Sequence, residues 1–217
     1  MRLETYFQIK AEVESKSAKL IAVCKNQSMD DVKKLYNAGC RVFAENRVQE
    51  LLLKAKQLPD DIEWHLIGSL QKNKVKDIVS VVSMIHSVDS YELATVINNR
   101  SVQIGKVTPI LLQLLVAQEE TKHGYLYSEL IEESKKTEWM ELSHISINGI
   151  MGMASFTEDK DQIRAEFRLL KKYFTNLKDN FSGQNQFNQL SMGMSSDYKI
   201  ALEEGSTMVR IGSLLFQ

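Results

Sequence analysis

The sequence contains few of the residues that define several classes of protein. Its 217 residues include only two cysteines and two prolines, and the cysteines, Cys24 and Cys40, form no CxxC pair. Two separate cysteines exclude a disulfide-rich scaffold and give no zinc-binding pattern. No Gly-, Pro- or Ser-rich stretch divides the chain, so we expect one domain over residues 1–217 without sequence repeats.

Features of membrane, secreted and nucleic-acid-binding proteins are also absent from the sequence. No run approaches the roughly 20 apolar residues of a membrane span, and the N-terminus lacks the apolar core of a signal peptide. The formal net charge is −1, and acidic residues surround the short basic clusters. This balance gives no electrostatic case for nucleic acid or for an anionic membrane. We therefore expect a soluble, cytoplasmic protein.

Short apolar runs of strand length alternate with helical patterns along the chain. The expected strands are 20–25, 41–45, 62–67, 82–87, 108–116, 146–151, 189–192 and 207–211. The expected helices are 29–38, 48–55, 73–79, 90–98, 125–136, 163–177 and 196–203, and the polar segment 178–188 is expected to be a loop. About eight strands that alternate with helices predict a parallel α/β fold, and a compact (β/α)₈ barrel fits this chain length. An open doubly wound sheet is the alternative, although no G-x-G-x-x-G follows any expected strand.

In such a barrel the active site lies at the carboxyl ends of the strands. The residues expected there are Lys25, 45–46, His65, 86–87, 151–152, 191–195 and 210–213. This set lacks paired carboxylates for hydrolysis and a His–Asp–His group, so we assign no metal ligands. Lys25 is its one amine, and loss of hydration at the tip of a buried strand is expected to lower its pKa and favour Schiff-base chemistry. The alternative is a surface lysine that merely follows a strand.

Two loops at these strand ends suit a phosphate. Residues 191–197 precede an expected helix, so that free backbone N–H groups and the helix dipole face an anion. A serine hydroxyl there either donates to the phosphate or caps the helix. Gly212 and Ser213 follow the eighth strand and offer close backbone approach with a hydroxyl. An amine that forms an imine, together with a phosphate site, points to pyridoxal 5′-phosphate (PLP).

Several blocks of the sequence resemble the pyridoxal phosphate homeostasis protein family. They occur in order between residues 20 and 216: AVCK at 22–25, ENRVQE at 45–50, WHLIG at 64–68, LQKNK at 70–74, IHSVD at 85–89, LSMGMS at 190–195 and GSTMVRIG at 205–212. The resemblance covers almost the whole chain. It implies a single (β/α)₈ TIM barrel of the alanine racemase N-terminal type, PLP fold type III, that holds the cofactor on a lysine.

The resemblance also implies roles for individual residues. Lys25 matches the imine-forming lysine, and Arg210 would face the pyridine nitrogen. The phosphate would be held by three residues: Ser195, Gly212 and Ser213. Two residues would lie beside the ring, Asn46 and His65. The alternatives are a helix cap for Asn46 and a hydrogen-bonded core position for His65.

Some positions depart from the family pattern. The triplet Cys24-Lys25-Asn26 stands where Ser-Lys-Thr is usual, and Ser213 stands where threonine is common. Residues 117–124 retain only part of a usual serine- and glycine-containing stretch. None of these changes removes the lysine or a phosphate donor, so we expect binding to be retained, and only the fine tuning of affinity and exchange is left open.

The pocket chemistry favours holding the cofactor over catalysis. An arginine cannot accept a proton from the pyridine nitrogen, so the cofactor is a poor electron sink. By resemblance, alanine racemases add a tyrosine base from a second domain of another subunit, whereas this sequence is expected to end after its eighth strand with no closing helix and no such domain. We expect a monomeric, non-catalytic carrier of PLP in vitamin B6 homeostasis that affects amino-acid and keto-acid balance, with apo-PLP enzymes as candidate partners. A weak amino-acid racemase or another small PLP enzyme is the alternative, and a barrel that binds a phosphorylated sugar or nucleotide is a third.

Overall fold

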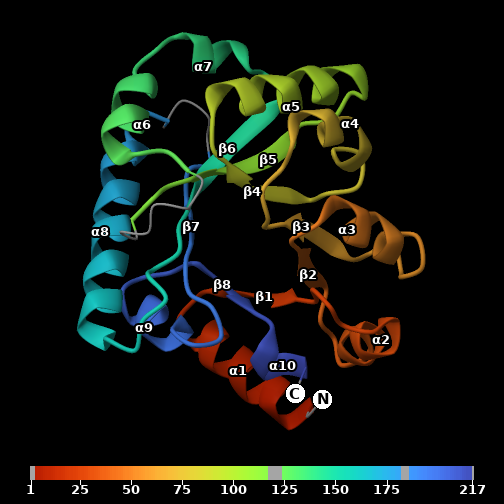
Figure 1. The fold of residues 1–217 in the computed structure, drawn as a ribbon. Coiled ribbons are helices and arrows are strands. Elements are labelled where there is room, and N and C mark those ends of the chain that lie inside the picture. The colour runs from red at the N-terminus through yellow and green to blue at the C-terminus, as the bar shows by residue number, and fades with distance from the viewer. Residues whose placement is uncertain (1–2, 117–123, 182–185, 217) are drawn as a thin grey trace.

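A computed structural model describes residues 3–116, 124–181 and 186–216 of the chain. They form a closed barrel in which eight parallel strands follow one another in sequence order (Figure 1). The strands are β1 Lys19–Val23, β2 Val42–Glu45, β3 Glu63–Leu66, β4 Met84–Val88, β5 Thr108–Gln113, β6 Ile145–Met151, β7 Gln189–Ser191 and β8 Met208–Ile211. Because β1 pairs with both β2 and β8, the sheet has no open edge. The expected (β/α)₈ barrel is confirmed, and the open doubly wound sheet is wrong.

Helices surround this barrel (Figure 1). They are α1 Leu3–Ser15, α2 Met29–Asn37, α3 Val48–Ala55, the 3₁₀ helix η1 Lys72–Lys74, α4 Val75–Ile78, α5 Tyr91–Gln103, α6 Tyr127–Glu133, α7 Glu138–Glu141, α8 Lys160–Lys178, α9 Tyr198–Glu203 and α10 Ser213–Phe216. Side-chain caps start three of them, because Ser28, Ser90 and Asp159 accept hydrogen bonds from the first-turn N–H groups of α2, α5 and α8.

Three helices were not expected from the sequence: α1, α7 and α10. The expectation of no closing helix after the eighth strand is wrong, since α10 follows β8 and contacts α1. The segment expected as a loop, 178–188, begins with the last residue of α8, and residues 182–185 lie outside the described residues. The helix expected at 196–203 begins two residues later, at Tyr198.

Strand alternation divides the core into two layers. Inside the barrel lie Ile21, Val23, Val42, Ala44, Met84, Leu111, Met151 and Met208, whereas their strand neighbours pack outward against the helices. Cys24 is fully buried in the outer layer, so the alternation gives Lys25 the parity of the inward-facing Ile21 and Val23. His65, His86, Ser191 and Arg210 have the same inward parity on their strands.

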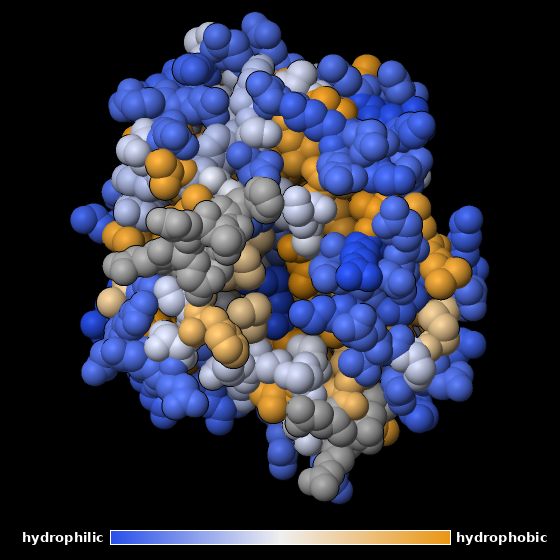
Figure 2. Space-filling view, viewed as in Figure 1, coloured by the Kyte–Doolittle hydropathy of each residue, from blue (hydrophilic) through white to orange (hydrophobic). Residues whose placement is uncertain are grey.

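One face of the molecule is largely hydrophilic. On the face shown in Figure 2, hydrophilic residues cover most of the periphery, and hydrophobic residues appear mainly in recesses between surface elements. None of the helices in the described part of the chain is both long and apolar enough to cross a membrane.

Candidate functional site

Lys25 lies immediately after β1, at the carboxyl end of the barrel. Its side chain is exposed, and its amine has no hydrogen-bond or ion-pair partner among the described residues. The expected loss of hydration is therefore wrong for this structure, because the chain around Lys25 does not bury it. Asn26 follows with a φ of 60°, a left-handed conformation that asparagine adopts more readily than a β-branched residue. Asn26, where threonine is usual, thus suits the turn that presents the free amine.

A buried ion pair supports the backbone just before this lysine. Lys54 of α3 forms an ion pair with Glu45 of β2, and both side chains are almost completely buried. The Lys54 amine also donates a 2.7 Å hydrogen bond to the carbonyl of Cys24. Burial and the nearby Glu45 carboxylate raise the pKa of the Cys24 thiol well above its ordinary value. Cys24 is thus an un-ionised packed thiol, and the ion pair connects α3 to the peptide that precedes Lys25.

Arg210 of β8 is held inside the barrel by neutral groups. Its guanidinium donates to Ser191 Oγ at 2.6 Å and to the Gly152 carbonyl at 3.0 Å. Burial lowers the pKa of Arg210 to about 10, and the Asp197 carboxylate opposes this shift. Arg210 therefore stays charged at neutral pH. These two bonds use two of the five guanidinium N–H groups, which leaves donors for a ligand.

The three residues expected to hold a phosphate meet beside Arg210. The backbone N–H of Gly212 donates to Ser195 Oγ at 3.3 Å, and Ser213 begins α10 directly after Gly212. Ser195 does not cap α9, whose N-cap is Asp197. A Cβ at Gly212 would lie 3.0 Å from the Val23 carbonyl oxygen, so glycine permits the close approach of this loop to the end of β1.

One part of the expected phosphate site is wrong. The Met194 N–H is not free for a phosphate, because it donates to Asp197 Oδ1 at 2.5 Å. Burial raises the pKa of Asp197, and Arg210 opposes this shift. The turn before α9 is therefore partly satisfied by the protein's own carboxylate, and the Ser195 hydroxyl remains its candidate donor.

The two residues expected beside a ring occupy different environments. Asn46 is exposed at the end of β2, and it does not cap α3, whose N-cap is Arg47. Gly68 lies against its backbone, since a Cβ there would come within 2.1 Å of the Asn46 carbonyl oxygen. His65 is only 2% exposed and its Nδ1 lies 2.9 Å from His86 Nε2. The core position considered for His65 is thus observed, and its contact with a ring stays a prediction.

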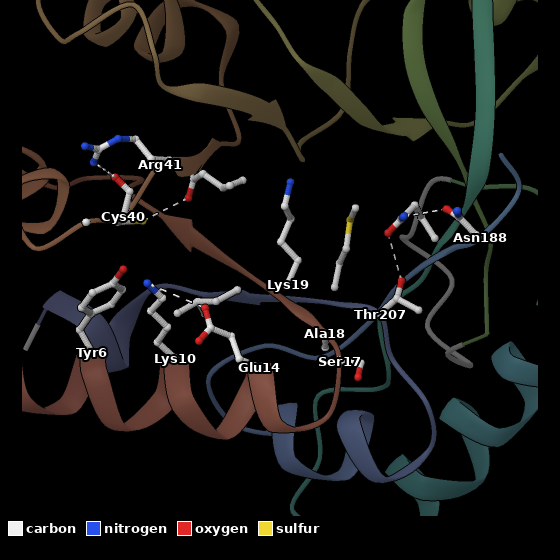
Figure 3. Close-up of a pocket in the computed structure, with 15 residues that line it drawn as sticks. Tyr6, Lys10, Glu14, Ser17, Ala18, Lys19, Cys40, Arg41, Asn188 and Thr207 are labelled. Atoms are coloured by element: carbon white, nitrogen blue, oxygen red, sulfur yellow. Dashed lines mark hydrogen bonds and ion pairs between the residues drawn. The ribbon is translucent and has the colours of Figure 1, made fainter.

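A separate cavity of about 600 Å³ lies at the opposite, amino-terminal end of the barrel. Lys10 and Glu14 from α1 and Lys19 from β1 point into it (Figure 3). Its cations are neutralised locally, because Lys19 forms a 2.8 Å ion pair with Glu63 and Arg41 forms one with Asp61. This cavity contains none of the residues expected to bind a cofactor.

Sequence reasoning assigned no role to His86, Ser191 and Lys54. His86 and Ser191 were placed near strand ends, and strand alternation indicates that they share the inward side with His65 and Arg210. No sequence signal identifies Lys54 as the partner of Glu45. In the part of the chain that the structure describes, no group of three or more His, Cys, Asp or Glu residues is arranged to hold a metal ion. Of the stretch at 117–124 that departs from the family pattern, residues 117–123 lie outside the described residues.

Comparison with known proteins supports the resemblance seen in the sequence. A family model described as the alanine racemase N-terminal domain matches residues 4–217. A pyridoxal phosphate homeostasis protein of Aquifex aeolicus is 40% identical over 204 residues, which cover 92% of this chain and 86% of that protein. One from Schizosaccharomyces pombe is 33% identical over 215 residues, covering 96% and 87% of the two chains.

Solved structures agree with these relatives. PipY of Synechococcus elongatus without PLP superposes with a TM-score of 0.92 at 33% identity, and the match covers 99% of both chains. PipY with PLP bound superposes with a TM-score of 0.88 at 32% identity. Alanine racemase of Clostridium difficile, at 15% identity, a TM-score of 0.72 and 56% of its length, shares the fold alone. The chain therefore belongs to the pyridoxal phosphate homeostasis protein family and has the barrel of the alanine racemase N-terminal domain.

Proposed function

We propose that this protein binds PLP as a Schiff base on Lys25 and acts as a non-catalytic carrier in PLP homeostasis. The observation that carries the proposal is the exposed, unpartnered amine of Lys25, at the same end of the barrel as the spare donors of Arg210 and the Ser195–Gly212 contact. Family membership and the PLP-bound structure of PipY support the choice of ligand. The single domain of residues 1–217, the cytoplasmic location, the monomeric state, delivery to apo-enzymes and effects on amino-acid and keto-acid balance belong to this proposal.

Each site residue at the carboxyl end of the barrel has a defined role in this proposal. Lys25 would supply the amine that holds the PLP aldehyde as an imine, a condensation that releases one water. Ser195 and Ser213 donate hydroxyl hydrogen bonds to the phosphate, next to the closely packed Gly212 backbone. Asn46, with no cap to form, is available as a further donor beside the ring.

The chemistry of Arg210 is the reason for proposing a carrier and not an enzyme. When bound, PLP supplies an aldehyde and a conjugated ring that withdraws electrons most strongly when its nitrogen is protonated. A charged guanidinium has donors only, so Arg210 holds the pyridine nitrogen unprotonated. The ring then stabilises a carbanion poorly, which suits reversible holding better than amino-acid chemistry.

Absorbance and mass mapping test the proposal. We expect purified protein mixed with PLP to show an imine absorbance, and borohydride reduction to fix the adduct on the peptide that contains Lys25. Lys25→Ala should lose both signals and retain at most non-covalent binding. Lys19→Ala is the matched control, because Lys19 begins β1, the strand that precedes Lys25, at the other end of the barrel. Retention of the adduct in Lys25→Ala would contradict the assignment.

The racemase alternative has a distinct signature. Incubation of PLP-loaded protein with L-alanine in deuterium oxide should give no rapid exchange at Cα. Rapid exchange that depends on Lys25 would show an enzyme and overturn the carrier role. A protein that stays colourless and forms no adduct with PLP would instead favour a barrel for another phosphorylated ligand.

A further inference from the structure

A chain of hydrogen bonds crosses the barrel lumen from β8 to β3. Arg210 donates to Ser191 Oγ at 2.6 Å, His86 Nδ1 lies 3.1 Å from the same oxygen, and His86 Nε2 lies 2.9 Å from His65 Nδ1. All four residues are at most 4% exposed. The rest of the inward layer is composed largely of valine, isoleucine, leucine, alanine and methionine, so this polar group is a local exception.

The chemistry of Arg210 fixes the direction of the first hydrogen bond, and the acceptors within reach of Ser191 indicate the direction of the other two. A guanidinium has no acceptor, so Ser191 Oγ accepts from it and the serine proton points to another partner. Among the described residues that partner is His86 Nδ1, which must then be the unprotonated nitrogen of a neutral ring. His86 consequently carries its proton on Nε2 and donates to His65 Nδ1. His65 in turn carries its proton on Nε2.

Electrostatics keep the two histidines neutral. Burial lowers the pKa of His65 to about 3, with a smaller contribution from Lys19. Burial lowers the pKa of His86 well below its ordinary value, and His65 and Arg210 add to the effect. The charged groups that act on the chain are therefore Lys19 at one end and Arg210 with Asp197 at the other. Neither histidine competes with Arg210 as a cation at neutral pH.

No carboxylate forms an ion pair with Arg210 within the described residues; its two contacts are a hydroxyl and a carbonyl. Neutral acceptors orient a guanidinium but do not cancel its charge. A carboxylate in the place of Ser191 would draw the charge toward the barrel interior. Because Ser191, His86 and His65 are neutral, the charge and the spare N–H groups of Arg210 remain for a ligand at the carboxyl end of the barrel.

We infer that Ser191, His86 and His65 are positioning residues for Arg210, and that their ordered hydrogen bonds direct its spare N–H groups and its charge toward the ligand. The inference depends on the proposed function only for the identity of that ligand, PLP. On this inference, residues from four strands, β3, β4, β7 and β8, together determine the electronic state of the pyridine nitrogen. Arg210 alone does not determine it.

The proton positions can be measured without cofactor. Long-range ¹H–¹⁵N correlation spectra of histidine-labelled protein should show His65 and His86 as neutral rings protonated on Nε2 at pH 7. The chain has only four histidines, which makes the assignment by substitution tractable. A His86 ring protonated on Nδ1, or a doubly protonated ring at pH 7, would overturn the inference.

The consequence for the ligand is tested at Ser191. Ser191→Ala should weaken PLP binding about tenfold, since a hydrogen bond to a charged group is lost, and should move the pH at which the bound chromophore titrates. Ser191→Thr, which keeps the hydroxyl, should restore both. Unchanged affinity and titration in Ser191→Ala that circular dichroism shows to be folded would overturn the positioning role. Wild-type protein that forms no PLP adduct would instead refute the proposed function and leave the tautomer result standing.

Discussion

Each end of β1 presents a lysine: Lys19 begins the strand and Lys25 lies two residues beyond its last residue, and the two lysines differ in their partners. Lys19, at the amino-terminal end, forms a 2.8 Å ion pair with Glu63 beside a cavity of about 600 Å³. Lys25, at the carboxyl end, has an exposed amine without a partner among the described residues. The Lys19 amine is engaged by Glu63, whereas the Lys25 amine is unengaged and can approach an aldehyde. The absence of a partner for the Lys25 amine therefore distinguishes the carboxyl end from the amino-terminal end.

The ion pairs at the two ends of the barrel also differ in burial. At the carboxyl end, the Glu45–Lys54 pair is almost completely buried and fixes the Cys24 carbonyl. At the amino-terminal end, the side chains of Lys19 and Glu63 are each almost half exposed. Buried pairs are costly to break, whereas exposed pairs contribute little. The protein thus has a buried ion pair next to Lys25, whereas the ion pair that Lys19 itself forms is half-exposed and weak.

The largest expected effect comes from breaking the buried pair. Lys54→Met leaves the Glu45 carboxylate buried without its cation, and we expect the free energy of unfolding to fall by about 3–5 kcal/mol. Denaturant titration measures the change. The double variant Glu45→Leu with Lys54→Met removes both charges and should recover most of the loss. A Lys54→Met loss below about 1 kcal/mol would show that the two ends are equally tolerant.

The polar chain between the two ends predicts a pH dependence of stability. The folded-state pKa of His65 is about 3, below the ordinary value of about 6.5, so the unfolded chain binds more protons between these values. The free energy of unfolding should therefore fall as pH decreases from about 6.5, by about 1.4 kcal/mol per pH unit for each buried histidine. Stability from this source is present above the unfolded-state pKa and absent below the folded-state value.

Two variants isolate that dependence in urea titrations between pH 6.5 and 4.5. His65→Gln should remove about half of the slope, because His86 continues to titrate. His144→Gln should leave the slope unchanged, since His144 contacts Ser143 and is not part of the polar chain. An unchanged slope in His65→Gln would mean that the lumen histidines are protonated in the folded state.

Much of this comparison was accessible from sequence because strand ends must meet. Strand order alone assigned three residues to the carboxyl end of the barrel: Lys25, Arg210 and Gly212. The closed barrel confirms that strand order. Their contacts were not accessible, because Ser191 and His86 are 105 residues apart and meet only through the barrel's closure. The expected burial of Lys25 failed for the same reason, since the exposure of a strand-end side chain depends on the loops around it.

Short elements were the other source of error. Helix α10 has only four residues, too few for a periodic pattern, and it is held by contact with α1. The turn before α9 was read as a row of free donors, but the Asp197 side chain accepts one of them. Local sequence shows which groups are present in such a turn, and tertiary packing decides which of them bind one another.

The phosphate loops give an effect of intermediate size. Ser195→Ala should weaken binding of PLP about tenfold, because a hydroxyl donor to a charged oxygen is lost. Binding of pyridoxal, which lacks the phosphate, should be unchanged by the same substitution. Fluorescence titration with both ligands separates the two cases. Equal weakening of PLP and pyridoxal would place Ser195 at the ring or in a structural role.

The smallest effect is expected at the amino-terminal end. Lys19→Met removes one partner of a half-exposed pair, so the free energy of unfolding should change by about 0–1 kcal/mol. Affinity for PLP should be unchanged, because the cations around this cavity are neutralised by Glu63 and Asp61. Denaturant titration measures the change in the free energy of unfolding. Titration of PLP and of inorganic phosphate into this variant measures the affinity. Weaker binding of either would show that the amino-terminal cavity shares the ligand with the Lys25 end, and the contrast between the two lysines would then be one of affinity.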